Sequence, residues 1–159
     1  MPPLLELDPK SGWLRYAFRF PILLFRLRLG WLLGGRFLML THVGRISGVP
    51  RYVVLEIVEH DKEANTYYVV SGWGKKSDWF QNIMKTPQVI VQVGNRRFPA
   101  QAEILTVQEG EKRLFRYAQK YPFPFRQLTR WYLGEALAPT HQNTQRMAQI
   151  TPLVRLNPD

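Results

Sequence analysis

The sequence predicts an α+β domain built on a barrel of about six mostly antiparallel strands with flanking helices. Three observations support this fold class: segments of strand-like composition recur, tight polar connections join most of them, and one short helical segment interrupts the series. A doubly wound sheet would instead need helices alternating with the strands. The chain has 159 residues, of which 45% are apolar and 13% aromatic, so it can form one well-packed core.

The first part of the chain is basic and apolar. Residues 13–33 predict a helix, which Pro21 should kink or break. We assign residues 1–36 to a basic amphipathic helical segment that precedes the barrel domain at 37–159. No acidic residue lies between Asp8 and Glu56, and no apolar run is long enough to span a membrane. Two interpretations stay open: a helix packed on the barrel with solvated arginines, and an amphipathic helix on a membrane surface.

Six segments combine β-branched and aromatic residues in the way that strands do. They are residues 37–43, 51–58, 66–71, 89–93, 96–105 and 150–156. Pro99 indicates that the fifth segment lies at a sheet edge, because proline cannot donate a ladder hydrogen bond. Alternation assigns to the core face Val53, Leu55 and Ile57 of the second strand and Phe98, Ala100, Ala102 and Ile104 of the fifth.

Helical signals are strongest in three places. Ser77 is a favourable N-cap for a short helix between the third and fourth strands. Thr106 followed by Glu109 forms a capping-box pattern, and Tyr-Pro-Phe-Pro at 121–124 should break the helix that it opens. Helices are expected at 78–85, 106–120 and 125–137, whereas the polar stretch 140–149 is expected to be irregular or weakly helical.

Two loops combine glycines, cationic side chains and hydroxyl groups. The first runs from Thr41 to Arg51 and the second from Ser71 to Asn82. Glycines permit close backbone approach, and a helix that begins after Ser77 offers free N–H groups to an anion. The net charge of +10 also favours an anionic partner. We therefore expect the loops to fold against each other around an anionic, planar cofactor; the alternative is a pair of solvated basic turns beside two core tryptophans.

Several kinds of site are excluded or disfavoured by composition and spacing. The chain has no cysteine, and its three histidines lack metal-ligand spacing, so no metal site is expected. The segment from Gly72 to Ser77 lacks the third glycine of a dinucleotide fingerprint and does not fit a phosphate-binding P-loop. No nucleic-acid reader motif accompanies the positive charge, so nucleic acid is not an expected partner.

Two motifs within residues 37–122 carry a family resemblance. The pattern Thr-x-x-Gly-Arg-x-Ser-Gly-x-Pro-Arg is matched by Thr41, Gly44, Arg45, Ser47, Gly48, Pro50 and Arg51. The pattern Trp-aromatic-x-Asn-Ile-x-x-x-Pro is matched by Trp79, Phe80, Asn82, Ile83 and Pro87, with further matches at Val91, Val93, Gly94, Tyr121 and Pro122. In these residues the chain resembles the deazaflavin-dependent nitroreductase family, whose split β-barrel is related to that of flavin-mononucleotide-binding proteins. Ile46 departs from the pattern, because the family has a basic residue there; Lys75 or Lys76 would compensate.

The resemblance implies that the chain binds coenzyme F-420, an 8-hydroxy-5-deazaflavin with a phosphate and an acidic tail. The phosphate and tail would meet Arg45, Ser47 and Arg51. Tyr121 would be a catalytic residue that orients the substrate. The full set of implied cofactor contacts is Arg45, Ser47, Gly48, Pro50, Arg51, Ser71, Gly72, Trp73, Gly74, Lys75, Lys76, Trp79 and Asn82.

The implied activity is that of an oxidoreductase. Reduced F-420 would transfer a hydride to a quinone, a nitroaromatic compound or an activated alkene, and the cofactor rather than the protein would carry the hard chemistry. The alternatives are a flavin-mononucleotide-dependent oxidoreductase and a non-catalytic deazaflavin- or flavin-binding protein of the same fold. A cytoplasmic location, on the membrane face or away from it, and a homodimer are both compatible with this interpretation.

Overall fold

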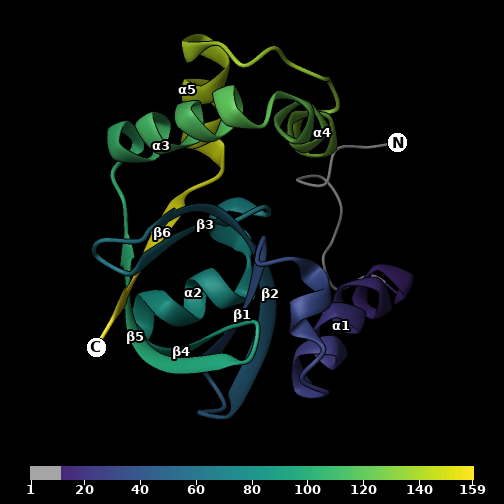
Figure 1. The fold of residues 1–159 in the computed structure, drawn as a ribbon, viewed down its shortest axis with the longest axis vertical. Helices are drawn as coiled ribbons and strands as arrows, with labels where there is room; N and C mark the ends of the chain where they lie inside the picture. The colour runs from purple at the N-terminus through teal and green to yellow at the C-terminus, as the bar shows by residue number, and fades with distance from the viewer. Residues whose placement is uncertain (1–11) are drawn as a thin grey trace.

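The computed structural model describes residues 12–159 and has six antiparallel strands in one closed barrel (Figure 1). The order around the barrel is β1-β2-β3-β6-β5-β4, and every neighbouring pair is antiparallel. The strands are β1 (Phe37–Val43), β2 (Pro50–Asp61), β3 (Thr66–Val70), β4 (Gln88–Val93), β5 (Arg96–Ile104) and β6 (Leu153–Pro158). The predicted α+β barrel with flanking helices is confirmed.

The helices occupy three places around this barrel. In Figure 1, α1 lies beside β2, α2 lies across the inside of the barrel, and α3, α4 and α5 form a layer above it. Two short 3-10 turns, η2 and η3, precede β1 and α2. The bounds are α1 (Gly12–Arg26), η2 (Gly30–Leu33), η3 (Gly74–Lys76), α2 (Asp78–Lys85), α3 (Val107–Lys120), α4 (Pro122–Leu133) and α5 (His141–Ile150).

The barrel interior is packed around α2. Trp79, Phe80 and Ile83 of this helix are buried against the inward-facing residues of the strands. Among those residues are Leu55, which is buried, and Val53 and Ile57, which pack on the core; the predicted core face of β2 is confirmed. Because α2 fills the barrel, its polar face is held at a fixed depth beside the β1–β2 turn.

A second apolar cluster joins the outer face of the barrel to the helical layer. Val58 of β2 and Val70 of β3 pack there against Leu114 of α3 and Phe125 of α4. Thr106 opens α3 with the predicted capping box: its hydroxyl accepts from the Glu109 N–H, and the Glu109 carboxylate accepts from the Thr106 N–H. The helical layer therefore has its own core and does not merely cover the sheet.

Two predictions about β5 are wrong. The strand is not at an edge, because β4 and β6 flank it in the closed barrel. Pro99 is tolerated because it lies one residue outside the stretch paired with β6, where its carbonyl accepts from the Asp159 N–H. Ile104 is 41% exposed, whereas Ala100 and Ala102 are buried as predicted; the next buried residue is Leu105, so the alternation ends with the strand.

The later helices differ from their predicted bounds. The predicted break after Lys120 is confirmed, because Tyr121 separates α3 from α4; α4, however, begins at Pro122 rather than at residue 125, since a proline suits the first helical position. The helix ends at Leu133, where Gly134 takes a left-handed conformation with φ +80°. Residues 141–150 form a regular helix, α5, with Thr140 as its N-cap and Thr144 and Met147 buried, so the polar stretch was under-predicted.

The segment before the barrel is helical as predicted, but α1 continues through Pro21 and ends at Arg26. Phe25 is buried, and its carbonyl accepts from the Gln92 side-chain amide of β4. Gly30 fits here because a Cβ atom would lie only 2.6 Å from the Phe25 ring. Among residues 12–159, no helix is long and apolar enough to cross a membrane.

Candidate functional site

The β1–β2 connection is a tight turn built on two glycines. The Gly44 N–H donates to the Val49 carbonyl, and the Gly48 N–H donates to the Gly44 carbonyl, both at 2.9 Å. Gly48 has φ +67°, which non-glycine residues rarely adopt. A Cβ atom on Gly44 would meet the Ser47 hydroxyl at 2.7 Å and the Arg51 Nε at 3.2 Å. Glycine at this position therefore lets a hydroxyl and a guanidinium group converge over the backbone.

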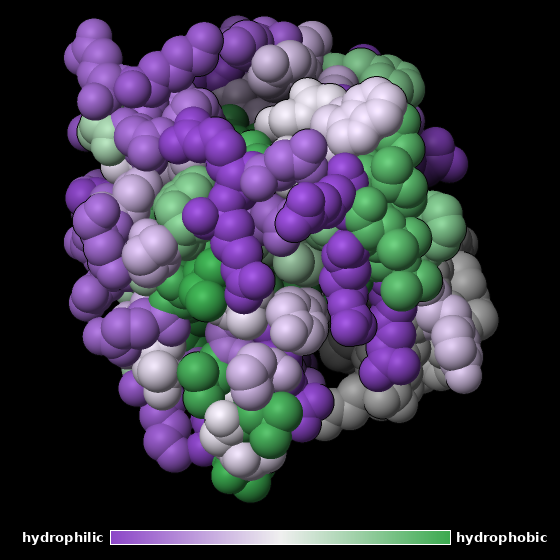
Figure 2. Space-filling view, turned by 60° about the horizontal axis from the view of Figure 1, so that its bottom comes forward, coloured by the Kyte–Doolittle hydropathy of each residue, from purple (hydrophilic) through white to green (hydrophobic). Residues whose placement is uncertain are grey.

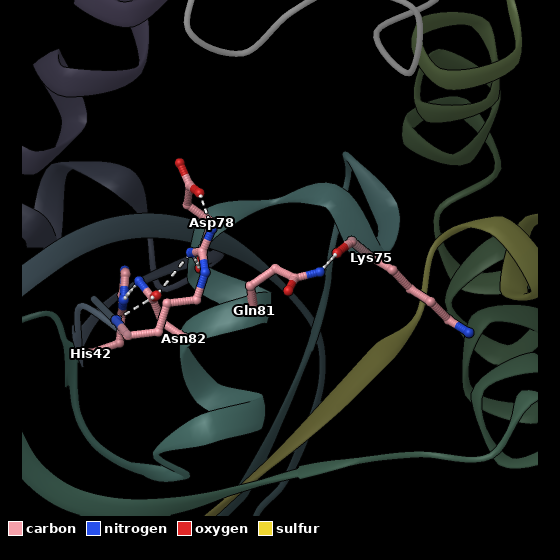
Figure 3. Close-up of polar contacts among 6 residues, drawn as sticks. His42, Lys75, Asp78, Gln81 and Asn82 are labelled. Carbon is pink, nitrogen blue, oxygen red and sulfur yellow. Dashed lines mark hydrogen bonds and ion pairs between the residues drawn. The ribbon is translucent and has the colours of Figure 1, made fainter. Parts of the chain in front are cut away.

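One face of α2 holds this turn through Arg45 (Figure 3). Asn82 Oδ1 accepts from the Arg45 backbone N–H and from its Nη1, each at 3.0 Å. The Asp78 carboxylate lies 3.1 Å from Arg45 Nη2, and Lys85 Nζ donates to the Arg45 carbonyl at 2.7 Å. Residues 78, 82 and 85 follow helical spacing, so one face of α2 presents all three to the turn. The two predicted loops thus contact each other as expected.

A histidine completes the network from inside the barrel wall. His42 of β1 is buried and stands opposite Arg51 in the β1–β2 register. Its Nδ1 lies 3.0 Å from Asn82 Nδ2. Burial, together with the nearby Arg51, lowers the pKa of the His42 imidazole to about 4. The ring is therefore neutral near pH 7.

The turn and α2 enclose an open cavity of about 370 Å³. The volume is within the usual range for a small-molecule site. Arg51 makes no ion pair with a carboxylate among residues 12–159, whereas Arg45 is partly neutralised by Asp78. Ile46 is 92% exposed, so the residue that departs from the family pattern points into solvent. The cavity is lined by Gly44, Arg45, Ile46, Ser47, Arg51, Asp78 and Asn82.

The part of the second loop that lies between β3 and α2, residues 71–77, forms its side-chain hydrogen bonds internally. The Ser71 and Ser77 hydroxyls lie within hydrogen-bonding distance of each other and, at 2.7 and 2.9 Å, of the Gly74 carbonyl, so their two protons are shared among these three contacts. Ser77 stands at the predicted N-cap position, but its side chain makes no capping hydrogen bond, because the hydroxyl is engaged in this network. The two serine hydroxyls of the loop are therefore engaged within it.

Close packing explains the glycines of this second loop. A Cβ atom on Gly72 would lie 2.5 Å from the Tyr132 hydroxyl of α4. One on Gly74, which has φ +60°, would lie 2.7 Å from the Ile150 carbonyl of α5. Both glycines thus bring the loop against the helical layer.

The remaining predicted site residues are spread more widely. Trp79 is buried in the barrel core, whereas Trp73 is half-buried in the second loop. Lys75 and Lys76 are exposed just before α2, and the Lys75 carbonyl accepts from Gln81. Pro50 is exposed at the start of β2. Of the predicted site residues, the cavity brings together Arg45, Ser47, Arg51 and Asn82, and Gly48 lies in the same turn. Lys75 and Lys76 lie in η3, directly before α2, and do not line the cavity.

Tyr121 lies at the other end of β1. Its ring is 5.8 Å from the Arg36 guanidinium, which immediately precedes β1, whereas Arg45 follows it. The seven residues of β1 span about 20 Å. Beside Tyr121, the Glu56 carboxylate accepts from the Tyr117 hydroxyl at 2.7 Å and from Arg36 at 2.9 Å. Tyr121 therefore belongs to a separate polar group near the helical layer.

Sequence reasoning missed three members of the Arg45 network. They are His42, Asp78 and Lys85, none of which the sequence patterns place beside Arg45. The spacing 78, 82, 85 was a usable signal, because it places an acid, an amide and a lysine on one helix face. The contact with His42 depends on the packing of α2 inside the barrel, and no local pattern encodes it.

Comparison with known proteins identifies the family. The family described as F420H(2)-dependent quinone reductase matches residues 27–127, so the chain belongs to this family. It is accordingly an oxidoreductase, and coenzyme F-420 is its cofactor. The resemblance to deazaflavin-dependent reductases inferred from the two motifs is confirmed. No curated protein matches the chain.

Solved structures support the fold. An F420-H2 dependent reductase (FDR-A) matches with a TM-score of 0.52 and 24% identity, covering 77% of this chain and 94% of its own. A structure described as a domain-swapped dimer matches with a TM-score of 0.53 and 23% identity, covering 86% and 99%. HutZ, a haem storage protein from Vibrio cholerae, matches with a TM-score of 0.54 and 14% identity, covering 87% and 89%. The fold alone thus occurs with unlike functions, and the family assignment depends on the sequence.

The residues at the Arg45 turn fit the anionic part of such a cofactor. Ser47 and Arg51 converge where Gly44 has no side chain, and Arg51 has no carboxylate partner among the described residues. Hydroxyl and guanidinium groups are strong donors to phosphate and carboxylate oxygens. The single opposing charge is that of Asp78, which already pairs with Arg45. The donor set therefore suits a phosphate or an acidic tail better than a neutral ligand.

Proposed function

We propose that this oxidoreductase reduces a small electron-poor acceptor, with a quinone as the first candidate and nitroaromatic compounds or activated alkenes as further ones. The observation that carries the proposal is the cationic cavity at the Arg45 turn, which α2 fixes through Asn82 and Asp78. When bound, the reduced deazaflavin supplies the hydride. The chain's own residues bind and orient the two reactants.

Three groups would hold the phosphate and the acidic tail. Arg45 is anchored by α2, Arg51 is exposed on the facing strand, and Ser47 presents a hydroxyl between them. Gly48 and Pro50 shape the turn. Lys75 and Lys76 would add long-range attraction from the other end of the site, because both are exposed and neither forms an ion pair with a described residue.

The deazaflavin ring would lie toward the second loop and α2, at Ser71, Gly72, Trp73 and Gly74. The Ser71 hydroxyl is occupied within the loop, so this contact would be made by backbone groups and by the half-buried Trp73. Asn82 and Trp79 would act indirectly, the first through Arg45 and the second by fixing α2 in the barrel.

The acceptor would lie near Tyr121, whose ring is 38% exposed beside Arg36 and Lys120. A phenol hydroxyl can donate a hydrogen bond to a quinone or nitro oxygen. Tyr121→Phe should therefore raise the KM for a quinone several-fold and leave F-420 affinity unchanged. If the variant lost F-420 affinity instead, Tyr121 would belong to the cofactor site.

Titration with F-420 and with flavin mononucleotide tests the cofactor assignment directly. Fluorescence or calorimetric titration should show saturable F-420 binding that weakens as salt rises, because the contacts are ionic. Tight binding of flavin mononucleotide alone would favour the flavin-dependent alternative. If neither ligand bound, the assigned site would be wrong.

Oxidation of reduced F-420 with a panel of quinones, nitroaromatic compounds and activated alkenes distinguishes the enzyme from a carrier. The proposal expects turnover with at least one class of acceptor, measured as the loss of reduced-cofactor absorbance. Binding without turnover across the whole panel would support the non-catalytic alternative.

We also propose that residues 13–33 rest on an anionic membrane surface, where a lipid-soluble quinone would be available. Figure 2 shows hydrophobic and hydrophilic residues together on the side where α1 lies in Figure 1. Phe20, Leu23 and Leu27 are each more than half exposed and follow helical spacing, and Trp31 and Leu32 of η2 continue the face. Flotation with phosphatidylglycerol vesicles should be lost in Phe20→Glu/Leu27→Glu; equal flotation of variant and wild type would remove the idea.

A homodimer is a further proposal. The fold neighbour described as a domain-swapped dimer supports it by analogy at 23% identity. Sedimentation equilibrium at micromolar concentration would decide between a monomer of 18.7 kDa and a species of twice that mass.

A further inference from the structure

His42 is a buried polar residue that the proposed function does not use. It lies in β1 two residues before Gly44, and only 4% of its surface is exposed. Its Nδ1 lies 3.0 Å from the side-chain amide nitrogen of Asn82 and is hydrogen-bonded to it. The function of this buried hydrogen bond can be inferred from the other contacts of Asn82.

The donors and acceptors in this network can be assigned one after another, starting from Arg45, which can only donate. Asn82 Oδ1 accepts two bonds from Arg45, one from the backbone N–H and one from Nη1, so the carboxamide oxygen must face the turn. The amide NH2 then faces His42, and Nδ1 has to be the unprotonated, accepting nitrogen of the ring. The remaining ring proton is on Nε2. A chain of three side chains therefore runs from β1 through α2 to the turn (Figure 3).

We infer that His42 is a positioning residue for the anionic part of the cofactor: it fixes the Asn82 amide, and through it the guanidinium and backbone of Arg45. This inference rests on the proposed function. If position 42 had no acceptor, the side of the Asn82 amide that faces β1 would make no hydrogen bond in either of the two amide orientations. The flipped orientation would point NH2 at two Arg45 donors and release the turn.

A neutral acceptor is the appropriate group at this position. A carboxylate here would also hold the Asn82 amide, but it would lie opposite Arg51 and would cancel positive charge at the cavity. Burial and the facing Arg51 keep the imidazole neutral by lowering its pKa, whereas Asp78 acts in the opposite sense. His42 thus orders Arg45 without weakening the field that attracts an anion.

Two substitutions of similar size separate the acceptor from simple packing. In His42→Asn the Oδ1 atom is bonded to Cγ, as Nδ1 is in histidine, so the variant can still accept from Asn82. In His42→Leu the corresponding atom is a methyl group that cannot accept. His42→Phe, whose ring has no hydrogen-bond acceptor nitrogen, serves as a second non-accepting variant if His42→Leu does not fold.

The expected result is a rise in the F-420 Kd of about 5- to 10-fold in His42→Leu, the size of one buried hydrogen bond, and of less than about 2-fold in His42→Asn. In an Arg45→Ala background the difference between the two variants should disappear, because the effect passes through Arg45. Equal Kd values for His42→Leu and wild type would overturn the inference. So would an equal loss in both variants, or a loss that persists without Arg45.

A measurement without cofactor keeps this inference separate from the proposed function. The Arg45 Nε–H resonance should be sharp in wild type and His42→Asn, and broadened by exchange in His42→Leu. If wild type fails to bind F-420 while this pattern holds, the proposed function fails and the positioning role stands. If the resonance is the same in all three proteins, His42 does not order Arg45.

Discussion

The Arg45 turn and the loop from Ser71 to Ser77 have similar compositions, with glycines, serines and cationic residues, but the structure uses them differently. In the Arg45 turn, the polar side chains point outward or are held by another element, α2. In the second loop, both serine hydroxyls bond within the loop and to the Gly74 carbonyl. The first loop therefore has the polar side chains that we propose as contacts for the anionic part of the cofactor, whereas the serine hydroxyls of the second loop stabilise the loop itself.

The difference shows that residue types alone do not identify a binding loop. What matters is where each donor finds its partner. A hydroxyl satisfied inside its own loop contributes to stability, whereas a guanidinium held by a neighbouring helix stays available to a ligand on its other side. Four predictions follow this contrast, ordered from the largest expected effect.

Removal of a cation should affect the two loops unequally. Arg45→Ala should raise the F-420 Kd about 100-fold, because a charge-assisted contact worth about 2.7 kcal/mol is lost. Lys76→Ala should raise it less than about 3-fold, since an exposed lysine contributes through long-range attraction. Calorimetric titration measures both. A larger loss for Lys76→Ala would reverse the roles of the two loops.

Removal of a hydroxyl should separate binding from stability. Ser71→Ala should lower the free energy of unfolding by about 1–2 kcal/mol, because the buried Gly74 and Ser77 groups lose a partner. Ser47→Ala, at an exposed position, should change it by less than about 0.5 kcal/mol and weaken F-420 binding instead. Urea unfolding and titration of the two variants test the pair. A stability loss in Ser47→Ala alone would contradict the comparison.

Acid should destabilise the protein through His42. The folded-state pKa of about 4 lies below the ordinary 6.5, so the unfolded chain binds a proton first as the pH falls. Stability contributed by the neutral imidazole is present above pH 6.5 and is lost between 6.5 and 4. From pH 7 to pH 5 the loss should be about 2 kcal/mol.

The matched control for this pH effect is His42→Asn, which does not titrate in this range. The difference in unfolding free energy between wild type and His42→Asn should change by the same amount between pH 7 and pH 5. Parallel curves for wild type and His42→Asn would show that His42 titrates normally.

The smallest effect concerns the opposing charge at the Arg45 turn. Asp78→Asn should lower the F-420 Kd by about 2- to 5-fold at low ionic strength, because an exposed pair contributes only about 0.2–1 kcal/mol. The gain should shrink as salt is added. Asp61→Asn, in the β2–β3 hairpin, is the control for a general change in net charge. A higher Kd in Asp78→Asn than in wild type would mean that the Asp78–Arg45 ion pair orients Arg45 for binding.

Much of this fold was predictable from the sequence. The strands follow from β-branched, alternating segments, and the capping box at Thr106 is local chemistry that the structure reproduces. The wrong predictions concern residues whose structure is decided by tertiary contacts rather than by their local sequence. Pro99 reads as an edge residue, yet it lies in a strand that is paired on both sides, because its missing donor falls one residue beyond the stretch paired with β6. Residues 141–150 lack a strong helical pattern but form α5 by packing Met147 and Ala148 on α3 and the outer barrel face.

The candidate site was predictable in part. The motif residues Arg45, Ser47 and Arg51 meet at one cavity, as the pattern of glycine and charge indicated. The hydrogen bond between His42 and Asn82 joins residues forty positions apart, and it exists only because α2 lies inside the barrel. The capping role assigned to Ser77 was wrong in its side-chain contact, because Ser71 competes for the hydroxyl.

The position of α2 inside the barrel restricts how this protein could be altered, by evolution or by a protein engineer. Four of its eight residues, Trp79, Phe80, Asn82 and Ile83, are buried, so changes there would disturb the core and the cavity at once. We therefore expect substitutions that retune cofactor preference without loss of folding to be tolerated best at its exposed positions 78 and 85 and in the turn at 45–51. Ile46, which is exposed in this turn, is one such position.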